Sequence, residues 1–211
     1  MNSVFQWCAT MMIVVTTLSV TALAKAHGDE VGVNVGDSAP AFSLKNVDGK
    51  KVALSDFSSA KGAIIVFTCN HCPYSVKYED RIIALHQQFA SKGYPVIAIN
   101  PNDPVSVPED SYDQMIVRAK EKKFPFPYLV DETQEIAKAY GAKRTPHVYV
   151  VTNTKDGSKV TYIGAIDDNA ADASAAETFF VRDAVTALLA GNLPATPLTK
   201  AIGCTIKWKK K

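Results

Sequence analysis

The clearest pattern along the chain is an alternation of short apolar runs with longer amphipathic segments. The apolar run 63–67 predicts a buried strand, and the run 94–100 predicts another. Between them, from about residue 70 to 91, apolar side chains recur at helical spacing. We expect the buried stripe of this helix to consist of Tyr74, Tyr78, Ile82, Leu85 and Phe89.

Turn and capping signals divide the remaining sequence into further short elements. A hairpin is expected around Asp48-Gly49, because this dipeptide favours tight turns between strands. Ser106 with Glu109 resembles a capping box, and Asp131 with Gln134 resembles another helix start. The other expected elements are a helix from 106 to 122, a strand at 126–131, a short helix ending at Tyr140, paired strands at 147–152 and 159–164, and a helix from 175 to 190.

This order of elements predicts an α/β fold. Strands that alternate with helices imply a parallel sheet core, and the late hairpin adds an antiparallel edge. We therefore expect a central mixed β-sheet flanked by helices, with an N-terminal β-hairpin and a C-terminal extended tail. The expected boundaries are a lead-in at 27–40, the folded domain at 41–193 and the tail at 194–211.

Composition is that of one ordinary globular domain. The chain has 211 residues, of which 47% are hydrophobic and 21% charged, and its formal net charge is +2. Such a balance gives no strong attraction to nucleic acid or anionic membranes, so no nucleic-acid partner is expected.

The N-terminus predicts export. Residues 9–24 carry no charge, and the small residues around Lys25 suit cleavage after Ala26, although no Lys or Arg precedes the apolar run. We expect residues 1–26 to be a signal peptide and the mature protein to be periplasmic or secreted. An uncleaved membrane anchor is the alternative.

The stretch "FTCNHCPYS", residues 67–75, carries the candidate chemistry. It places Cys69 and Cys72 where a strand ends and a helix begins, so the helix N-terminus would stabilise a thiolate at Cys69. His71 lies between them and would lower the Cys69 pKa further. Cys72, one turn later, could close a disulfide with Cys69. A structural zinc site would need two more ligands, and Cys204, His147 and His86 are isolated, so no metal is expected. A static surface disulfide is the other alternative.

A second stretch, "YGAKRTPHVYVV", resembles the cis-proline loop of thioredoxin-fold proteins. The resemblance implies that Pro146 is cis and that Arg144, Thr145 and Pro146 face the cysteine pair. From Val35 to Lys209 the chain is similar to the peroxiredoxin-like, AhpC/TSA-type redoxins of this superfamily. The stretches that carry this likeness are "VGDSAPAFSLKNVDGKKVALSDF", "FTCNHCPYS", "PEDSYDQM", "FPFPYLVDETQEIAKAYGA" and "GCTIKWK".

Two departures from the family pattern affect function. Thr68 directly precedes Cys69, so the longer peroxide-binding loop of peroxiredoxins is missing. The buried acid of thioredoxins has no counterpart in residues 63–68; Glu79 could replace it as proton acceptor, or be a solvated helix-face residue.

These features favour an exported thiol–disulfide oxidoreductase without a cofactor. Cys69 would attack, a mixed disulfide would form, and Cys72 would resolve it. Thr145 and Pro146 would offer an edge to an extended substrate peptide, and Arg144 would help to hold the thiolate. Partners would be thiols or disulfides and a thiol protein that donates or accepts electrons. Oxidation, reduction and isomerisation all remain open.

Two other functions fit the same residues. A thiol peroxidase would use Cys69 on peroxide. A copper-handling protein would use the cysteines with His71 or His147, because thiolate and imidazole suit Cu(I).

Cys204 lies in the tail, where Ile202, Ile206 and Trp208 alternate with polar residues as in a docked extended segment. It could be a buried inert thiol, a second resolving cysteine like those of related peroxiredoxins, or an intermolecular partner. Gly203 would let the backbone approach closely. We expect oxidised protein to hold a Cys69–Cys72 bridge and Cys204 to stay free.

Overall fold

The computed structural model describes residues 32–210. The predicted signal peptide, residues 1–26, lies outside this range, as does Cys8. Within the described range, no helix is both long and apolar enough to cross a membrane.

A seven-stranded mixed sheet forms the centre of the fold, in the order β2-β1-β5-β4-β3-β7-β8. Its three central strands are parallel, and antiparallel strands extend it at both edges. The strands are β1 (Ser43–Asn46), β2 (Lys51–Ala53), β3 (Gly62–Phe67), β4 (Val96–Asn100), β5 (Tyr128–Val130), β7 (His147–Thr154) and β8 (Gly157–Gly164). This arrangement confirms the predicted α/β class and both hairpins.

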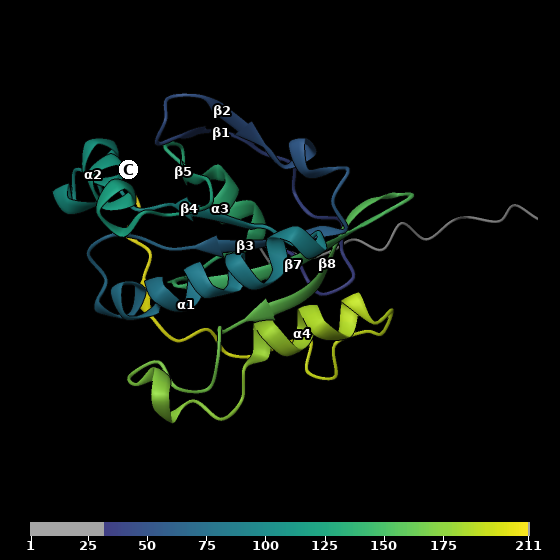
Figure 1. Ribbon diagram of the computed structural model, residues 1–211. Helices are drawn as coiled ribbons and strands as arrows, with labels where there is room; N and C mark the ends of the chain where they lie inside the picture. Colours follow the sequence, from purple (N-terminus) through teal and green to yellow (C-terminus); the bar gives the residue numbers. More distant parts are fainter. Residues whose placement is uncertain (1–31, 211) are drawn as a thin grey trace, which may run out of the picture. The chain divides into compact units, whose positions relative to one another are not determined.

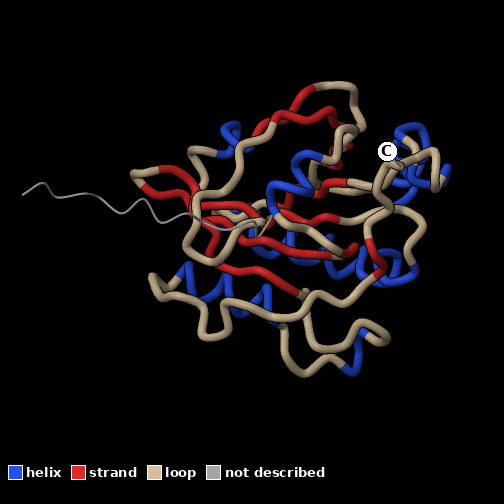
Figure 2. The backbone as a smooth tube through the Cα atoms, turned by 180° about the vertical axis from the view of Figure 1, so that it is seen from behind, coloured by secondary structure: helices blue, strands red, loops and turns tan. Residues whose placement is uncertain are grey.

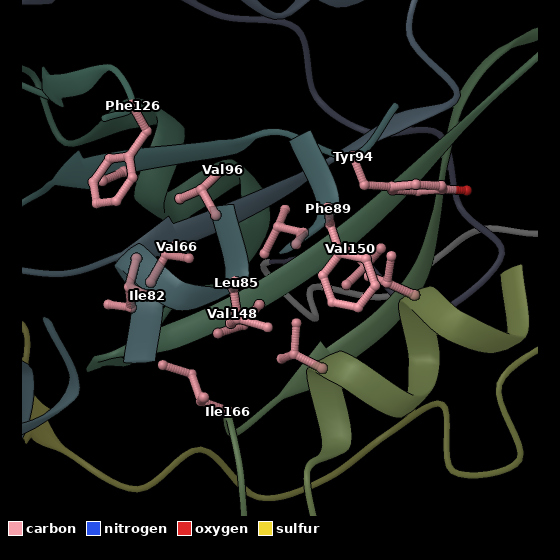
Figure 3. Packing of buried hydrophobic residues seen from close by; sticks show 14 of the residues in the cluster. Val66, Ile82, Leu85, Phe89, Tyr94, Val96, Phe126, Val148, Val150 and Ile166 are labelled. Atoms are coloured by element: carbon pink, nitrogen blue, oxygen red, sulfur yellow. The ribbon is translucent and has the colours of Figure 1, made fainter. Parts of the chain in front are cut away.

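Helices cover both faces of the sheet (Figures 1 and 2). One face packs against α1 (Pro73–Phe89), α2 (Tyr112–Lys122) and α4 (Phe180–Leu189), and the other packs against α3 (Glu135–Tyr140). Every residue of β3 and β4 is buried, which explains their continuous apolar sequences. Figure 3 shows the first face, where Ile82, Leu85 and Phe89 of α1 lie against valines of the sheet.

The start of α1 differs from the prediction. The helix begins at Pro73, three residues later than expected, because its proline fixes a helical φ and lacks an N–H that a helix would use. Tyr74 is 40% exposed and does not belong to the buried stripe, whereas the other four predicted members are buried.

The other helices also begin later than predicted. Ser106 does not cap α2; its hydroxyl and N–H donate to Asp103, and a short 3-10 turn at Pro108–Asp110 precedes the helix. The last helix starts at Phe180, after a separate 3-10 turn at Ala173–Ala175. The predicted cap of α3 is confirmed for Asp131, whose Oδ2 accepts the N–H of Ala137 at 2.7 Å.

The C-terminal tail folds back onto the body of the domain. Its strand β9 (Cys204–Thr205) pairs antiparallel with β6 (Arg144–Thr145) in a second, two-stranded sheet. Ile206 is buried there, but Ile202 and Trp208 are 41% and 39% exposed, so the predicted inward-facing alternation holds for Ile206 alone. In Figure 1 the yellow C-terminal segment passes the beginning of α1.

Candidate redox site

The loop between β3 and α1 presents the two cysteines of the sequence motif. Cys69 lies in this loop, and Cys72 is the N-cap residue of α1, whose carbonyl accepts the N–H of Val76. The helix N-terminus therefore begins at Cys72 and not at Cys69. Both cysteines are buried, with exposed fractions of 3% for Cys69 and 0% for Cys72.

The disulfide in the structure joins Cys72 to Cys204, and Cys69 is a free thiol. The predicted Cys69–Cys72 bridge with a free Cys204 is therefore wrong for this state. The reason is the pairing of β9 with β6, which places Cys204 directly opposite Thr145. The carbonyl oxygen of Thr145 lies 3.3 Å from Cys72 Sγ, so the strand pairing brings Cys204 to Cys72.

Gly203 makes this approach of the tail possible. A Cβ atom at residue 203 would collide with the carbonyl group of Thr145 and with the nitrogen of Pro146. The expectation of a close backbone approach at Gly203 is confirmed.

Polar side chains surround the free thiol of Cys69. Its Sγ lies 3.3 Å from Oγ1 of Thr145, 3.6 Å from Nδ1 of His71 and 3.8 Å from the hydroxyl of Ser75. The Thr145–Pro146 peptide bond is cis, as the resemblance implied. The structure thus brings Cys69, Cys72, His71 and Thr145 together.

Burial, and after it the nearby carboxylate of Asp110, raise the pKa of the Cys69 thiol to about 11, although the hydrogen bonds with Thr145 and Ser75 act in the opposite direction. The expected stabilisation of a Cys69 thiolate is therefore wrong for the disulfide-bonded state. That prediction placed Cys69 at the helix N-terminus, but Cys72 occupies this position.

Asp110 is the site residue that sequence reasoning missed. Its Oδ1 accepts the backbone N–H groups of Asn70 and His71 at 2.7 and 3.1 Å, and its Oδ2 lies 2.5 Å from His71 Nδ1. Asn102 donates to the same carboxylate, whose side chain is fully buried. The only sequence signal was its position in "PEDSYDQM", a stretch that supported the resemblance. Asp110 fixes the loop that carries both cysteines.

Glu79 is not a solvated helix-face residue. It is 4% exposed and pairs with Arg118 through two hydrogen bonds, of 2.7 and 2.8 Å, and with Lys122 at 3.3 Å. Glu79 and Cys69 both line one small cavity, together with Ile82, Phe124, Phe126 and Tyr128. Its free space, about 10 Å³, admits one water-sized molecule.

The predicted redox-tuning residue Arg144 contacts the C-terminal tail. Its guanidinium donates to the carbonyl of Gly203 at 2.8 Å, so it holds the tail instead. The edge of Thr145, expected to receive a substrate peptide, is occupied by β9.

A metal could be held by Cys69, His71 and Asp110, whose ligand atoms all lie within 4.8 Å of one another. His147 is not part of this group. It is buried on β7 and accepts from the N–H of Lys143.

Comparison with known proteins defines the class. The model of the AhpC/TSA family matches residues 35–170. A crystal structure of an uncharacterized conserved protein from Geobacillus kaustophilus is 40% identical, covers 84% of this chain and 94% of its own, and has a TM-score of 0.78. Solved thiol–disulfide oxidoreductases below 25% identity share the fold alone.

Two named proteins are also similar to this chain in sequence. The thiol-disulfide oxidoreductase ResA of Geobacillus thermodenitrificans is 22% identical over 155 residues, which are 71% of this chain and 82% of ResA. The chloroplastic peroxiredoxin Q of Populus jackii is 29% identical over 109 residues, 52% of this chain and 47% of that protein.

Fold and site together define a redox protein with the thioredoxin-like fold. The chain belongs to the AhpC/TSA family. The recognition of family and fold from sequence is confirmed, and the names of the relatives agree with the expected enzyme class.

Proposed function

We propose that the protein is an exported thiol–disulfide oxidoreductase in which Cys69 is the nucleophile and Cys72 the resolving thiol. One observation carries this: the sulfurs of Cys69 and Cys72 both contact Thr145, next to cis-Pro146. Two thiols around one residue are placed to exchange a disulfide between them.

The reaction follows from thiol–disulfide exchange. The Cys69 thiolate attacks one sulfur of a substrate disulfide, and the other sulfur leaves as a thiolate and takes up a proton. Reduced Cys72 then attacks Cys69 Sγ, forming the Cys69–Cys72 disulfide and releasing the second substrate thiol. The substrate is reduced by two electrons and the cysteine pair is oxidised by two.

Activation of Cys69 is the main requirement of this scheme. With its pKa at about 11, Cys69 is protonated at neutral pH in the disulfide-bonded state. Nδ1 of His71 contacts both Cys69 Sγ and Asp110 Oδ2, so this histidine and carboxylate form the nearest polar route by which the thiol proton would leave. Undocking of the tail would also admit water and lower the cost of charge at Cys69.

Trapping of mixed disulfides tests the assignment. A Cys72→Ser variant made together with Cys8→Ser and Cys204→Ser is expected to retain one glutathione on Cys69 after treatment with oxidised glutathione, because no second thiol remains to resolve the mixed disulfide. The same chain with Cys69→Ser in place of Cys72→Ser is the matched control, and its Cys72 is expected to trap glutathione more slowly. Trapping that needs Cys72 and survives Cys69→Ser would overturn the proposal.

Export is supported by the charge-free run at 9–24 and the small residues around the predicted cleavage point. N-terminal sequencing of the protein recovered from its native compartment is expected to begin at His27. A chain that retains residues 1–26 would instead support the membrane-anchored alternative.

A thiol peroxidase is the second candidate. The small cavity beside Cys69 admits a water-sized molecule, whereas β9 closes the edge that a peptide would use. Cys69 thiolate would attack the peroxide, giving an alcohol or water and a sulfenic acid that Cys72 condenses with, releasing water. Dimedone labelling of Cys69 in Cys72→Ser after one equivalent of hydrogen peroxide distinguishes this activity: rapid labelling supports it, and labelling no faster than that of free cysteine excludes it.

A further inference from the structure

The tail occupies the place where a substrate peptide was expected. Strand β9 pairs antiparallel with β6 and sets Cys204 opposite Thr145. The Gly203 carbonyl accepts from Arg144, and the absence of a side chain at Gly203 lets the backbone contact the Thr145–Pro146 peptide. Backbone pairing at this edge is the geometry that a bound peptide would have, and the tail adds to it a disulfide to Cys72.

The three cysteines of the described chain differ in access. Cys69 and Cys72 are buried, whereas Cys204 is partly exposed at the end of a two-residue strand. A thiol of another protein therefore meets the Cys72–Cys204 disulfide first at Cys204.

We propose that the tail is a built-in exchange partner: once Cys69 and Cys72 have formed a disulfide, Cys204 attacks Cys72 and moves the bridge to Cys72–Cys204. This inference rests on the proposed function, because it requires that Cys69 reacts first. The Cys204 thiolate forms a bond to Cys72 Sγ, the Cys69–Cys72 bond breaks, and Cys69 leaves as a thiolate. The exchange consumes no electrons, and the net proton movement is from Cys204 to Cys69.

The surroundings of Cys69 favour this direction. Released Cys69 lies in the buried pocket next to Asp110, where it takes up a proton and stops being a nucleophile. The reverse attack on Cys72 is thereby suppressed, and the disulfide collects at the position that an external dithiol reaches through Cys204.

A time course of disulfide mapping tests the order of events. The full chain is used with Cys8→Ser, which leaves Cys69, Cys72 and Cys204 of the four cysteines. Reduced protein is mixed with oxidised glutathione, quenched in acid at intervals and mapped by peptide mass. A Cys69–Cys72 peptide is expected first, followed by Cys72–Cys204 as the main product. In Cys204→Ser, Cys69–Cys72 is expected to persist.

Two variants test the role of docking. Gly203→Ala is expected to slow the second step about tenfold or more, because the added methyl group collides with the Thr145 carbonyl. Ala195→Val adds atoms at an exposed residue of the same tail and is expected to leave the rate unchanged.

The outcomes separate this inference from the proposed function. If Cys72→Ser traps glutathione on Cys69 but the unsubstituted chain ends at Cys69–Cys72, the inference alone is overturned. If Cys69→Ser forms Cys72–Cys204 as fast as the chain with Cys69, the disulfide forms directly and the relay is wrong. If Cys72→Ser traps nothing on Cys69, the proposed function fails as well.

Discussion

At the scale of single residues, the site shows how neighbours far along the chain decide the chemistry of a local motif. The local sequence pattern predicted that Cys69 and Cys72 lie between a strand and a helix, and the resemblance to thioredoxin-fold proteins implied that Pro146 is cis. The sequence did not reveal Asp110, since a carboxylate some 40 residues from the motif is brought to the cysteine loop only by the fold. The expectation of a low pKa for Cys69 failed because the thiol is buried and lies before the helix N-terminus, with the Asp110 carboxylate as a further cause.

The contribution of Asp110 can be measured by neutralising it. Asp110→Asn is expected to lower the Cys69 pKa by less than about one unit, because the carboxylate repels the thiolate, while burial, the larger cause, keeps the pKa above its ordinary value. Thiolate absorbance is titrated in the Cys72–Cys204 form with Cys8→Ser, where Cys69 is the titrating thiol. Asp113→Asn, at an exposed residue of α2, is the control. An unchanged or higher pKa would remove Asp110 from this role.

His147 makes stability depend on pH. Burial, together with Lys143 and Arg144, lowers the pKa of His147 to about 4 from an ordinary value of 6.5. The unfolded chain thus binds more protons between these values, so stability is complete above pH 6.5 and falls as the pH drops toward 4. The free energy of unfolding should decrease by up to about 3 kcal/mol between pH 6.5 and pH 4.

Urea unfolding at several pH values checks this assignment, with His147→Asn as the comparison. The difference in unfolding free energy between the two proteins is expected to shrink as the pH falls from 6.5 to 4. A difference that is constant over this range would mean that another group titrates.

At the scale of elements, sequence periodicity located the strands better than the helix starts. Strands β3 and β4 are buried on both faces, so their apolar runs mark them directly. Helix starts depend on which polar side chain reaches a free N–H, and Ser106 bonds to Asp103 instead of opening α2. A contact between helices that the local sequence does not reveal, the pair of Glu79 on α1 and Arg118 on α2, helps to hold α2 in place.

The Glu79–Arg118 pair is expected to be costly to break and cheaper to replace. Arg118→Met should destabilise the fold by about 2–4 kcal/mol, because it leaves a buried carboxylate with only the 3.3 Å contact to Lys122. The double variant Glu79→Gln/Arg118→Met should recover part of that loss, since no buried charge remains. Thermal and urea unfolding of the single and double variants measure the coupling. A double variant less stable than Arg118→Met would contradict the argument.

At the scale of the whole described chain, the C-terminal tail is joined to the domain by the pairing of β9 with β6 and by the Cys72–Cys204 disulfide. The resemblance covered the stretch around Cys204, and a docked extended segment was foreseen from its alternation. The partner of Cys204 was not, because pairing across 132 residues depends on the register between β9 and β6. A chain that keeps glycine at residue 203 can bring Cys204 opposite Thr145 and so place a third sulfur at the redox site.

The Cys72–Cys204 disulfide should also hold the described fold together. A cross-link that closes a loop of 132 residues reduces the entropy of the unfolded chain, which the loop-entropy relation places near 5 kcal/mol. Measured values are commonly lower, so Cys204→Ser is expected to lower the unfolding free energy by about 2–5 kcal/mol under oxidising conditions. In excess dithiothreitol both chains lack the bridge, and their stabilities should then agree to within about 0.5 kcal/mol. A gap that persists after reduction would show that Cys204 stabilises the tail by packing, and equal stabilities before reduction would show that this disulfide contributes nothing to the fold.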